Sequence, residues 1–299
     1  MRNVFEEFRI RTSDAGVDIA GQVGGKGPPL LLLHGNPLTR LSWDRIAPRL
    51  AEHFTVVATD LRGYGASSKP VGNGNHHEYS FRRMAQDQVE VMAHLGFDQF
   101  RVAGHDRGAR VAFRMALDHP RKVLKAAFLE ILPTHRVARD ISFQMAIDLY
   151  HWWFMAQPFP FPERLLEGNE EFYIRTKLTS QGPGKGGFTE MEIREYLRAC
   201  TPENIHAVCE DYRAAATVDL AMDTADFEAG RMVECPVLAL WGTRSHTALH
   251  HDVRAEWPKY CANVAGMHAL DCGHYPVEQA PDETYRLLSD FLRYPGDRR

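Results

Sequence analysis

The 299-residue chain is poor in cysteine, has no excess of basic residues and lacks long apolar runs. Its five cysteines are odd in number and never form a C-x-x-C pair, so we expect reduced thiols rather than a disulfide framework or a zinc site. The 35 basic side chains against 39 acidic ones leave a net charge of −4, which argues against a nucleic-acid-binding surface.

The sequence also argues against membrane and secreted classes. Apolar runs such as residues 30–33 are far shorter than the roughly 18 residues that span a bilayer. No apolar stretch follows the first few residues, so we expect no secretory signal. The composition is therefore typical of a cytoplasmic globular enzyme, acting on a small molecule, with no nucleic-acid or membrane partner.

Short apolar runs alternate with stretches of helical spacing along most of the chain. The predicted buried strands are residues 30–33, 56–59 and 100–103, and further strands are predicted at residues 123–129, 236–241 and 266–270. The predicted helices between and after them are residues 43–53, 80–95, 109–119 and 280–292. Such alternation requires crossover connections, so we predict an α/β fold with a mostly parallel sheet and helices on both faces.

The alternation stops at about residue 133 and resumes at about residue 233. Strand patterns vanish between these points, and aromatic residues crowd one stretch around residues 150–154. We therefore predict a core domain formed by residues 1–133 and 233–299, and a helical cap domain, residues 134–232. The cap is expected over the carboxyl edge of the sheet, where open α/β folds bind ligands.

The strongest chemical motif is the run Gly104-His105-Asp106-Arg107-Gly108, between a predicted strand and a predicted helix. It has the G-x-nucleophile-x-G frame of a nucleophile elbow, with aspartate where serine is usual. Glycines suit a tight strand-to-helix turn because neighbouring backbones leave no room for side chains. The helix N-terminus favours negative charge and would help to keep Asp106 ionised.

Three further residues complete a candidate catalytic set at the ends of predicted strands. His274 follows the last predicted strand, and Glu130 ends the strand at 123–129, so that nucleophile, acid and histidine come in the expected order. The loop at 242–246 has no carboxylate, which favours Glu130 as the residue that orients His274. The backbone N–H groups of Asn36 and Arg107 are expected to form an oxyanion hole.

These motifs resemble those of the α/β-hydrolases, and within them the fluoroacetate dehalogenases. The resemblance covers nearly the whole chain, and its most specific stretches are Gly104 to Arg110, Ile131-Leu132-Pro133-Thr134, Tyr150-His151-Trp152 and Glu210-Asp211-Tyr212-Arg213. It implies an α/β-hydrolase fold with a helical cap, no cofactor, no metal, and a homodimer. It also implies a hydrolytic dehalogenase of short 2-haloacids, which converts haloacetate to glycolate and halide.

The resemblance implies a role for each matching residue. Asp106 attacks the carbon that bears the halogen, and His274 activates the water that hydrolyses the resulting ester. The substrate carboxylate is bound by Arg107 and Arg110, whose spacing of three puts them on one helix face. The departing halide is bound by the N–H and O–H donors of three cap residues, which are His151, Trp152 and Tyr212.

Two positions depart from the usual pattern of the family and leave alternatives open. Fluoroacetate dehalogenases usually have Phe at the place of Asn36 and Asp at the place of Glu130, whereas one branch of the haloalkane dehalogenases has both residues found here. That branch has Trp at the place of Arg107, so a neutral haloalkane is a less suitable substrate.

An epoxide hydrolase would use the same aspartate with a cap tyrosine as acid. The candidate tyrosines are Tyr150, Tyr173, Tyr196 and Tyr212. A catalytically silent, ligand-binding relative is the alternative of another class.

Overall fold

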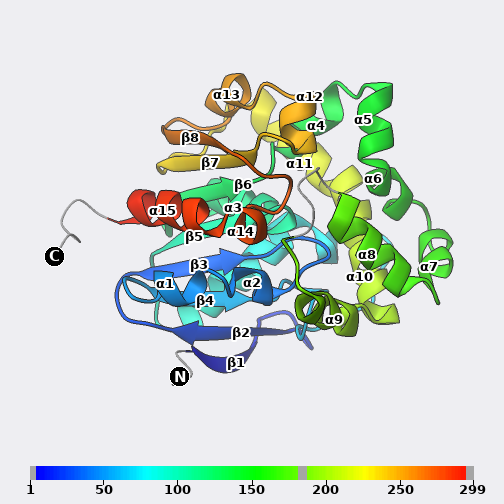
Figure 1. The fold of residues 1–299 in the computed structure, drawn as a ribbon, viewed down its shortest axis with the longest axis horizontal. Coiled ribbons are helices and arrows are strands. Elements are labelled where there is room, and N and C mark those ends of the chain that lie inside the picture. Colours follow the sequence, from blue (N-terminus) through cyan, green and yellow to red (C-terminus); the bar gives the residue numbers. More distant parts are fainter. Residues whose placement is uncertain (1–4, 181–186, 294–299) are drawn as a thin grey trace.

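The computed structural model describes residues 5–180 and 187–293 of the chain. Eight strands form one sheet in the order β1-β2-β4-β3-β5-β6-β7-β8 (Figure 1). The strands are β1 (Phe5–Arg11), β2 (Asp18–Gly24), β3 (Pro29–Leu33), β4 (Thr55–Thr59), β5 (Phe100–His105), β6 (Val123–Leu129), β7 (Val237–Gly242) and β8 (Val264–Leu270). From β4 to β8 the neighbours in the sheet run parallel, as the alternating pattern predicted.

The antiparallel edge formed by β1 and β2 was not predicted from the sequence. β1 pairs with β2 and β2 pairs with β4, both antiparallel. Neither strand has a continuous apolar run in its sequence. Most residues of β1 are exposed, and Gly21 interrupts the apolar residues of β2. A Cβ at residue 21 would lie 2.4 Å from the ring of Phe8, which is too close for two side chains, so glycine permits this packing.

Helices cover both faces of the sheet because successive strand residues point to opposite sides. Leu31 and Leu33 of β3 belong to one apolar core, with residues of α2 (Phe81–His94) and α3 (Arg107–Asp118). Leu30 and Leu32 belong to a second core, with residues of α1 (Ala47–Leu50) and α15 (Pro281–Leu292). The shorter α12 (His246–His250), α13 (Val253–Glu256) and α14 (Pro276–Gln279) join the last strands and helices.

The helix predicted at residues 43–53 is wrong in extent. The segment forms a 3₁₀ turn, Arg40–Trp43, followed by the short α1. Pro48 explains the late start, because proline has no N–H to donate and is tolerated only in the first turn of a helix. The apolar spacing was real, and Trp43 and Leu50 are both buried.

Between β6 and β7 the chain forms only helices in its described part, and Figure 1 shows them gathered beyond one end of the sheet. They are α4 (Thr134–Arg139), α5 (Phe143–Asp148), α6 (Tyr150–Met155), α7 (Phe161–Leu166), α8 (Glu170–Ser180), α9 (Glu190–Ala199), α10 (Pro202–Ala214), a π-helical turn (Ala215–Asp219) and α11 (Leu220–Glu228). Residues 181–186 of the predicted cap lie outside the described part. This helical insertion follows β6 directly, as the loss of strand patterns predicted.

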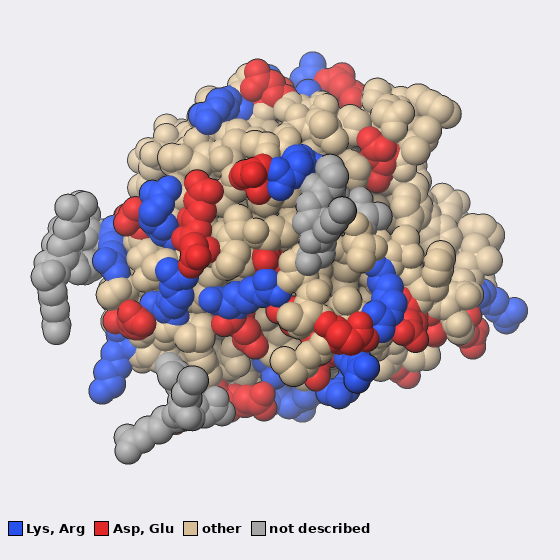
Figure 2. Space-filling model, viewed as in Figure 1, with Lys and Arg blue, Asp and Glu red and all other residues tan. Residues whose placement is uncertain are grey.

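Charged side chains of both signs lie side by side on the face shown in Figure 2. Exposed charged side chains also form ion pairs, such as Arg49 with Asp282 at 2.6 Å. Among the described helices, none combines the length and the apolar character that a membrane crossing requires.

A buried ion-pair cluster connects α3 to the insertion. Arg114 is almost fully enclosed, and its two terminal nitrogens lie 2.5 Å from carboxylate oxygens of Asp223 and Asp226 on α11. Because removal of one partner leaves buried charge without compensation, such pairs are costly to break.

We therefore predict that Arg114→Met lowers the free energy of unfolding by about 3–5 kcal/mol. The matched control is Arg286→Met, because Arg286 also faces two carboxylates but its side chain is 59% exposed. The control is expected to cost about 0–1 kcal/mol. Urea unfolding of both variants tests the prediction, and equal losses would contradict it.

Candidate active site

Asp106 lies at the sharp turn between β5 and α3. Its backbone has φ 49° and ψ −117°, a conformation that is uncommon for a residue with a side chain. A Cβ at Gly104 would lie 2.4 Å from the carbonyl oxygen of Gly108, and a Cβ at Gly108 would lie 2.4 Å from that of His34. The predicted need for glycine on both sides of Asp106 is therefore confirmed by these close backbone approaches.

The two carboxylate oxygens of Asp106 have different surroundings. Oδ1 accepts the backbone N–H of Asn36 at 3.0 Å, and Gly35 permits this approach because a Cβ there would lie 2.7 Å from Oδ1. Oδ2 lies 3.6 Å from Nε2 of His274. Burial by itself would raise the pKa of Asp106, but His274 outweighs it and holds the pKa well below its usual range.

His274 lies between two carboxylates. Its Nδ1 is 3.0 Å from Oε2 of Glu130, while its Nε2 points to Asp106. Burial by itself would lower the pKa of His274, but Asp106 and Glu130 outweigh burial and raise the pKa to about 9. The imidazole is therefore protonated at neutral pH in this arrangement.

Glu130 reaches His274 from the end of β6, as the sequence predicted. Its backbone turns with φ 61°, and its side chain is fully enclosed. Its Oε1 accepts the backbone N–H of Gly242, and Thr247 lies 3.4 Å from Oε2. These contacts hold a glutamate, one methylene longer than aspartate, in the position that orients the imidazole.

The two predicted arginines differ in their partners. Nε and Nη2 of Arg107 bind the carboxylate of Asp211 on α10, and its enclosed Nη1 has no hydrogen-bond partner. Arg110 donates only to neutral acceptors, the carbonyl of Leu132 at 3.0 Å and the hydroxyl of Thr134 at 3.1 Å, and its enclosed Nε has no partner. Burial and the nearby Arg107 lower the pKa of Arg110 to about 10, so it remains a cation.

The three predicted halide-binding side chains lie together. His151 and Trp152 come from α6, and the ring of Tyr212 on α10 lies 5.8 Å from that of His151 and 6.2 Å from that of Trp152. The side-chain amide of Asn36 donates to the Tyr212 hydroxyl at 3.4 Å. The guanidinium of Arg110 lies 4.6 Å from the centre of the Trp152 ring.

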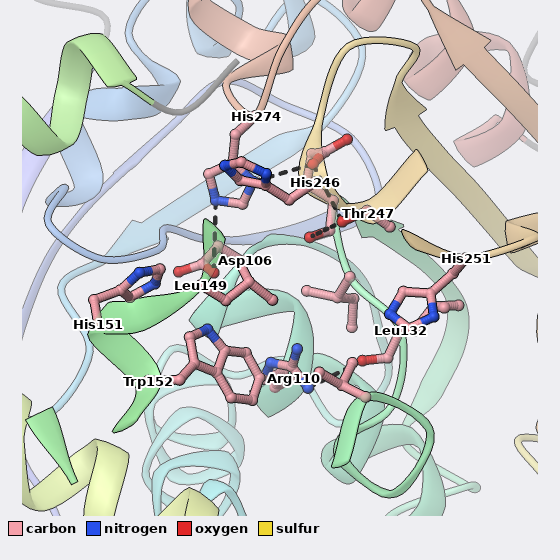
Figure 3. Close-up of a pocket in the computed structure, with 13 residues that line it drawn as sticks. Asp106, Arg110, Leu132, Leu149, His151, Trp152, His246, Thr247, His251 and His274 are labelled. Carbon is pink, nitrogen blue, oxygen red and sulfur yellow. Dashed lines mark hydrogen bonds and ion pairs between the residues drawn. The ribbon is translucent and has the colours of Figure 1, made fainter. Parts of the chain in front are cut away.

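One small cavity joins most of these groups (Figure 3). The volume of this cavity is about 40 Å³. It is lined by Asp106, Arg110, Glu130, Ile131, Leu132, Val137, Leu149, His151, Trp152, His246, Thr247, His251 and His274. Arg107, Tyr212 and Asn36 are not among the lining residues, although the backbone N–H of Asn36 binds Asp106. The cavity therefore presents to a small ligand a carboxylate, an imidazole and a guanidinium that forms no ion pair with any described residue.

Two buried charged residues that act on the groups of this site were not predicted from the sequence. Asp211, the partner of Arg107, was noted only as part of a motif. Lys177 on α8 is buried, and burial lowers its pKa to about 7 while the charge of Asp106 raises it. A lysine on a helix usually lies in solvent, so no pattern in the sequence pointed to this one.

Comparison with known proteins agrees with this geometry. Residues 28–281 match the family described as alpha/beta hydrolase fold. The chain is 43% identical to a fluoroacetate dehalogenase of a Burkholderia species, over 97% of this chain and 95% of that protein. It is 34% identical to a soluble epoxide hydrolase of Corynebacterium sp. (strain C12), over 86% and 87% of the two chains.

Two solved structures are also similar. One, from Nostoc sp PCC 7120 and assigned to the α/β hydrolases, has a TM-score of 0.93 and 48% identity over 97% of this chain and 98% of that one. The other is a mutant from Pseudomonas aeruginosa, assigned to the epoxide hydrolases and solved with bound MFA. It has a TM-score of 0.89 and 41% identity over 98% and 97% of the two chains. The fold, the elbow and these relatives together show that this chain belongs to the α/β-hydrolase family.

Proposed function

We propose that this protein is a hydrolytic dehalogenase of short 2-haloacids, which forms an ester on Asp106 and releases halide. The observation that carries the proposal is Arg110, a buried guanidinium with an unpartnered Nε in the same cavity as Asp106 and His274. A buried cation that forms no ion pair with any described residue suits an anionic substrate, because a substrate carboxylate could form that pair with it. The similarity to a fluoroacetate dehalogenase supports the same substrate class.

In the first step, Oδ2 of Asp106 attacks the carbon that bears the halogen. Oδ1 is held by Asn36 on the side closed by Gly35, so Oδ2 is the oxygen left for attack. A new C–O bond forms as the C–X bond breaks, and the halide leaves with the bonding electron pair. The aspartate is a ready nucleophile because it is already ionised.

Charge on the departing halide is stabilised by donors of the insertion. Figure 3 shows the indole nitrogen of Trp152 on the side that faces Asp106, with the imidazole of His151 beside it. Burial lowers the pKa of His151 well below its usual value, so it is a neutral N–H donor. Fluoride needs such donors most, because its charge is the most concentrated. In this proposal the insertion, residues 134–232, is the cap domain over the site.

The second step is hydrolysis of the ester, for which His274 must become a base. In the free enzyme the Asp106 carboxylate holds the pKa of His274 high. Ester formation removes that negative charge, so the pKa falls and the imidazole can lose its proton. His274 then takes a proton from water, and the water oxygen forms a bond to Cγ of Asp106. The bond between Cγ and the former Oδ2 breaks, and the departing glycolate oxygen takes the proton from His274. The backbone N–H of Asn36, already bound to Oδ1, is positioned to stabilise the resulting oxyanion.

An epoxide hydrolase is the second candidate, because Tyr212 lies near Asp106 and one relative is an epoxide hydrolase. Of the other candidate tyrosines, Tyr150 is about half exposed, Tyr196 is buried in a separate apolar cluster, and Tyr173 packs against that cluster. A neutral epoxide could not form an ion pair with Arg110, which has no such partner among the described residues, so the haloacid is the better substrate.

A single turnover in heavy-oxygen water tests the proposed function. With excess enzyme and fluoroacetate or chloroacetate, halide should be released and one heavy oxygen should appear in the Asp106 carboxylate. The glycolate should carry none, because its new oxygen comes from the aspartate. Label in glycolate but not in Asp106 would mean direct attack by water, and release of no halide from either acid would refute the function.

The resting His274 should titrate with a pKa of about 9 in NMR spectra of its imidazole. Since this pKa is raised, the contacts of His274 stabilise the fold fully below the usual pKa of about 6.5, and this stability is lost as the pH rises through 9. Asp106→Asn should lower the pKa. Asp271→Asn, whose carboxylate is 86% exposed, is the matched control and should leave it unchanged. A wild-type value near 6.5 would contradict the prediction.

Arg110→Leu should lower kcat/KM for haloacetates. A charge-assisted contact to a buried carboxylate is worth about 1.5–3 kcal/mol, which corresponds to a loss of roughly 10–150-fold. Chloroacetamide is the matched substrate control, because it keeps the halogen but lacks the charge, and its rate should change little. If the unmodified enzyme hydrolysed chloroacetamide as well as chloroacetate, Arg110 would not be the carboxylate site.

A further inference from the structure

A carboxylate and two imidazoles meet outside the proposed catalytic set, at the edge of the cavity. Asp148 is the last residue of α5, and His246 and His250 are the first and last residues of α12. Oδ2 of Asp148 lies 2.8 Å from Nε2 of His250 and 3.9 Å from Nδ1 of His246. One ligand atom from each residue lies within 4.8 Å of the others. The proposed dehalogenation uses none of the three.

One nitrogen of this cluster makes no hydrogen bond. Nδ1 of His246 is enclosed and has no hydrogen-bond partner. The two imidazole rings are stacked nearly parallel, 6.2 Å apart with 15° between their planes, because four residues separate them on one helix face. Buried polar atoms are normally satisfied, so an orphaned nitrogen next to a carboxylate and a second imidazole suggests a missing partner.

The chemistry of the three ligand atoms indicates which class of partner they would bind. Two imidazole nitrogens and one carboxylate oxygen suit zinc and similar transition metals, whereas magnesium and calcium prefer oxygen ligands alone. The second oxygen of Asp148 accepts the side-chain amide of Gln144 at 2.9 Å, which fixes the orientation of the carboxylate. We propose that Asp148, His246 and His250 bind a divalent metal ion of the zinc class.

This site would connect two parts of the chain. Asp148 belongs to the helical insertion and the two histidines follow β7, so a bound metal ties α5 to α12. His246 also lines the cavity that contains Asp106. A metal here therefore restrains the edge of the cavity and slows exchange of substrate and product. This consequence rests on the proposed function, whereas metal binding does not.

Calorimetric titration with zinc chloride tests the site in full-length protein first freed of metal with a chelator. We expect one zinc ion per chain with a dissociation constant in the micromolar range. His250→Gln and Asp148→Asn each remove a direct ligand, so each should weaken binding by at least the roughly tenfold that loss of a ligand-orienting partner costs. His94→Gln, which removes an exposed histidine of α2, is the matched control and should bind as the wild type does. No binding by the wild type, or equal binding by all variants, would overturn the proposal.

Two further measurements separate the site from its effect on activity. Cobalt(II) added to wild type should give visible absorption bands typical of nitrogen and oxygen ligands, and His250→Gln should lose them. Zinc should lower the rate of halide release in wild type, and the ratio of rates with and without zinc should approach one in His250→Gln. Zinc binding without an effect on rate would overturn the restraint at the cavity edge and leave the metal site standing.

Discussion

The negative charge of the buried Asp106 carboxylate is stabilised by nearby cations. This stabilisation depends on how closely three backbone segments approach one another. The turns at Gly35, Gly104 and Gly108 leave no room for side chains, and they bring a loop, a strand end and a helix start around one carboxylate. Asp106 therefore lies near His274 on one side and a backbone N–H on the other. If these turns were looser, the carboxylate would lose the contacts that keep it ionised in a buried site.

The arginines of α3 show how the insertion completes this balance. Arg107, Arg110 and Arg114 are all buried on the same helix. The first is neutralised by a carboxylate of α10 and the third by two carboxylates of α11, whereas Arg110 contacts only neutral acceptors and the Trp152 ring. The insertion thus supplies ion-pair partners to Arg107 and Arg114, whereas Arg110, which lines the cavity, has none among the described residues. This asymmetry supports an anionic substrate.

Charge also explains how one histidine serves two steps of the proposed reaction. His274 lies between Asp106 and Glu130, and both stabilise its protonated form. Esterification of Asp106 would remove one of the two charges, and the remaining Glu130 would keep the ring oriented. A base that forms only after the nucleophile has reacted would limit unproductive chemistry in the free enzyme.

Local patterns were sufficient for the parallel part of the sheet and for the elbow. Apolar runs revealed β3 to β8, and the glycines around Asp106 revealed the turn, because both depend on neighbours in the sequence. The antiparallel strands β1 and β2 were missed because β1 is a mostly exposed edge strand and neither strand contains a continuous apolar run. The order of Asp106, Glu130 and His274 was predictable, since each follows a strand whose end meets the same edge of the sheet.

The sequence by itself determined the fold class, the elbow and the residues at the strand ends, because these follow from short-range spacing and backbone sterics. Only the tertiary structure decided how each charge is compensated. Arg107 and Arg110 are identical in type and three residues apart, but Asp211, far along the chain, pairs with one and not with the other. The environment of Lys177 and the meeting of Asp148 with His246 and His250 were decided in the same way. Such contacts depend on how distant segments pack, and no local pattern records them.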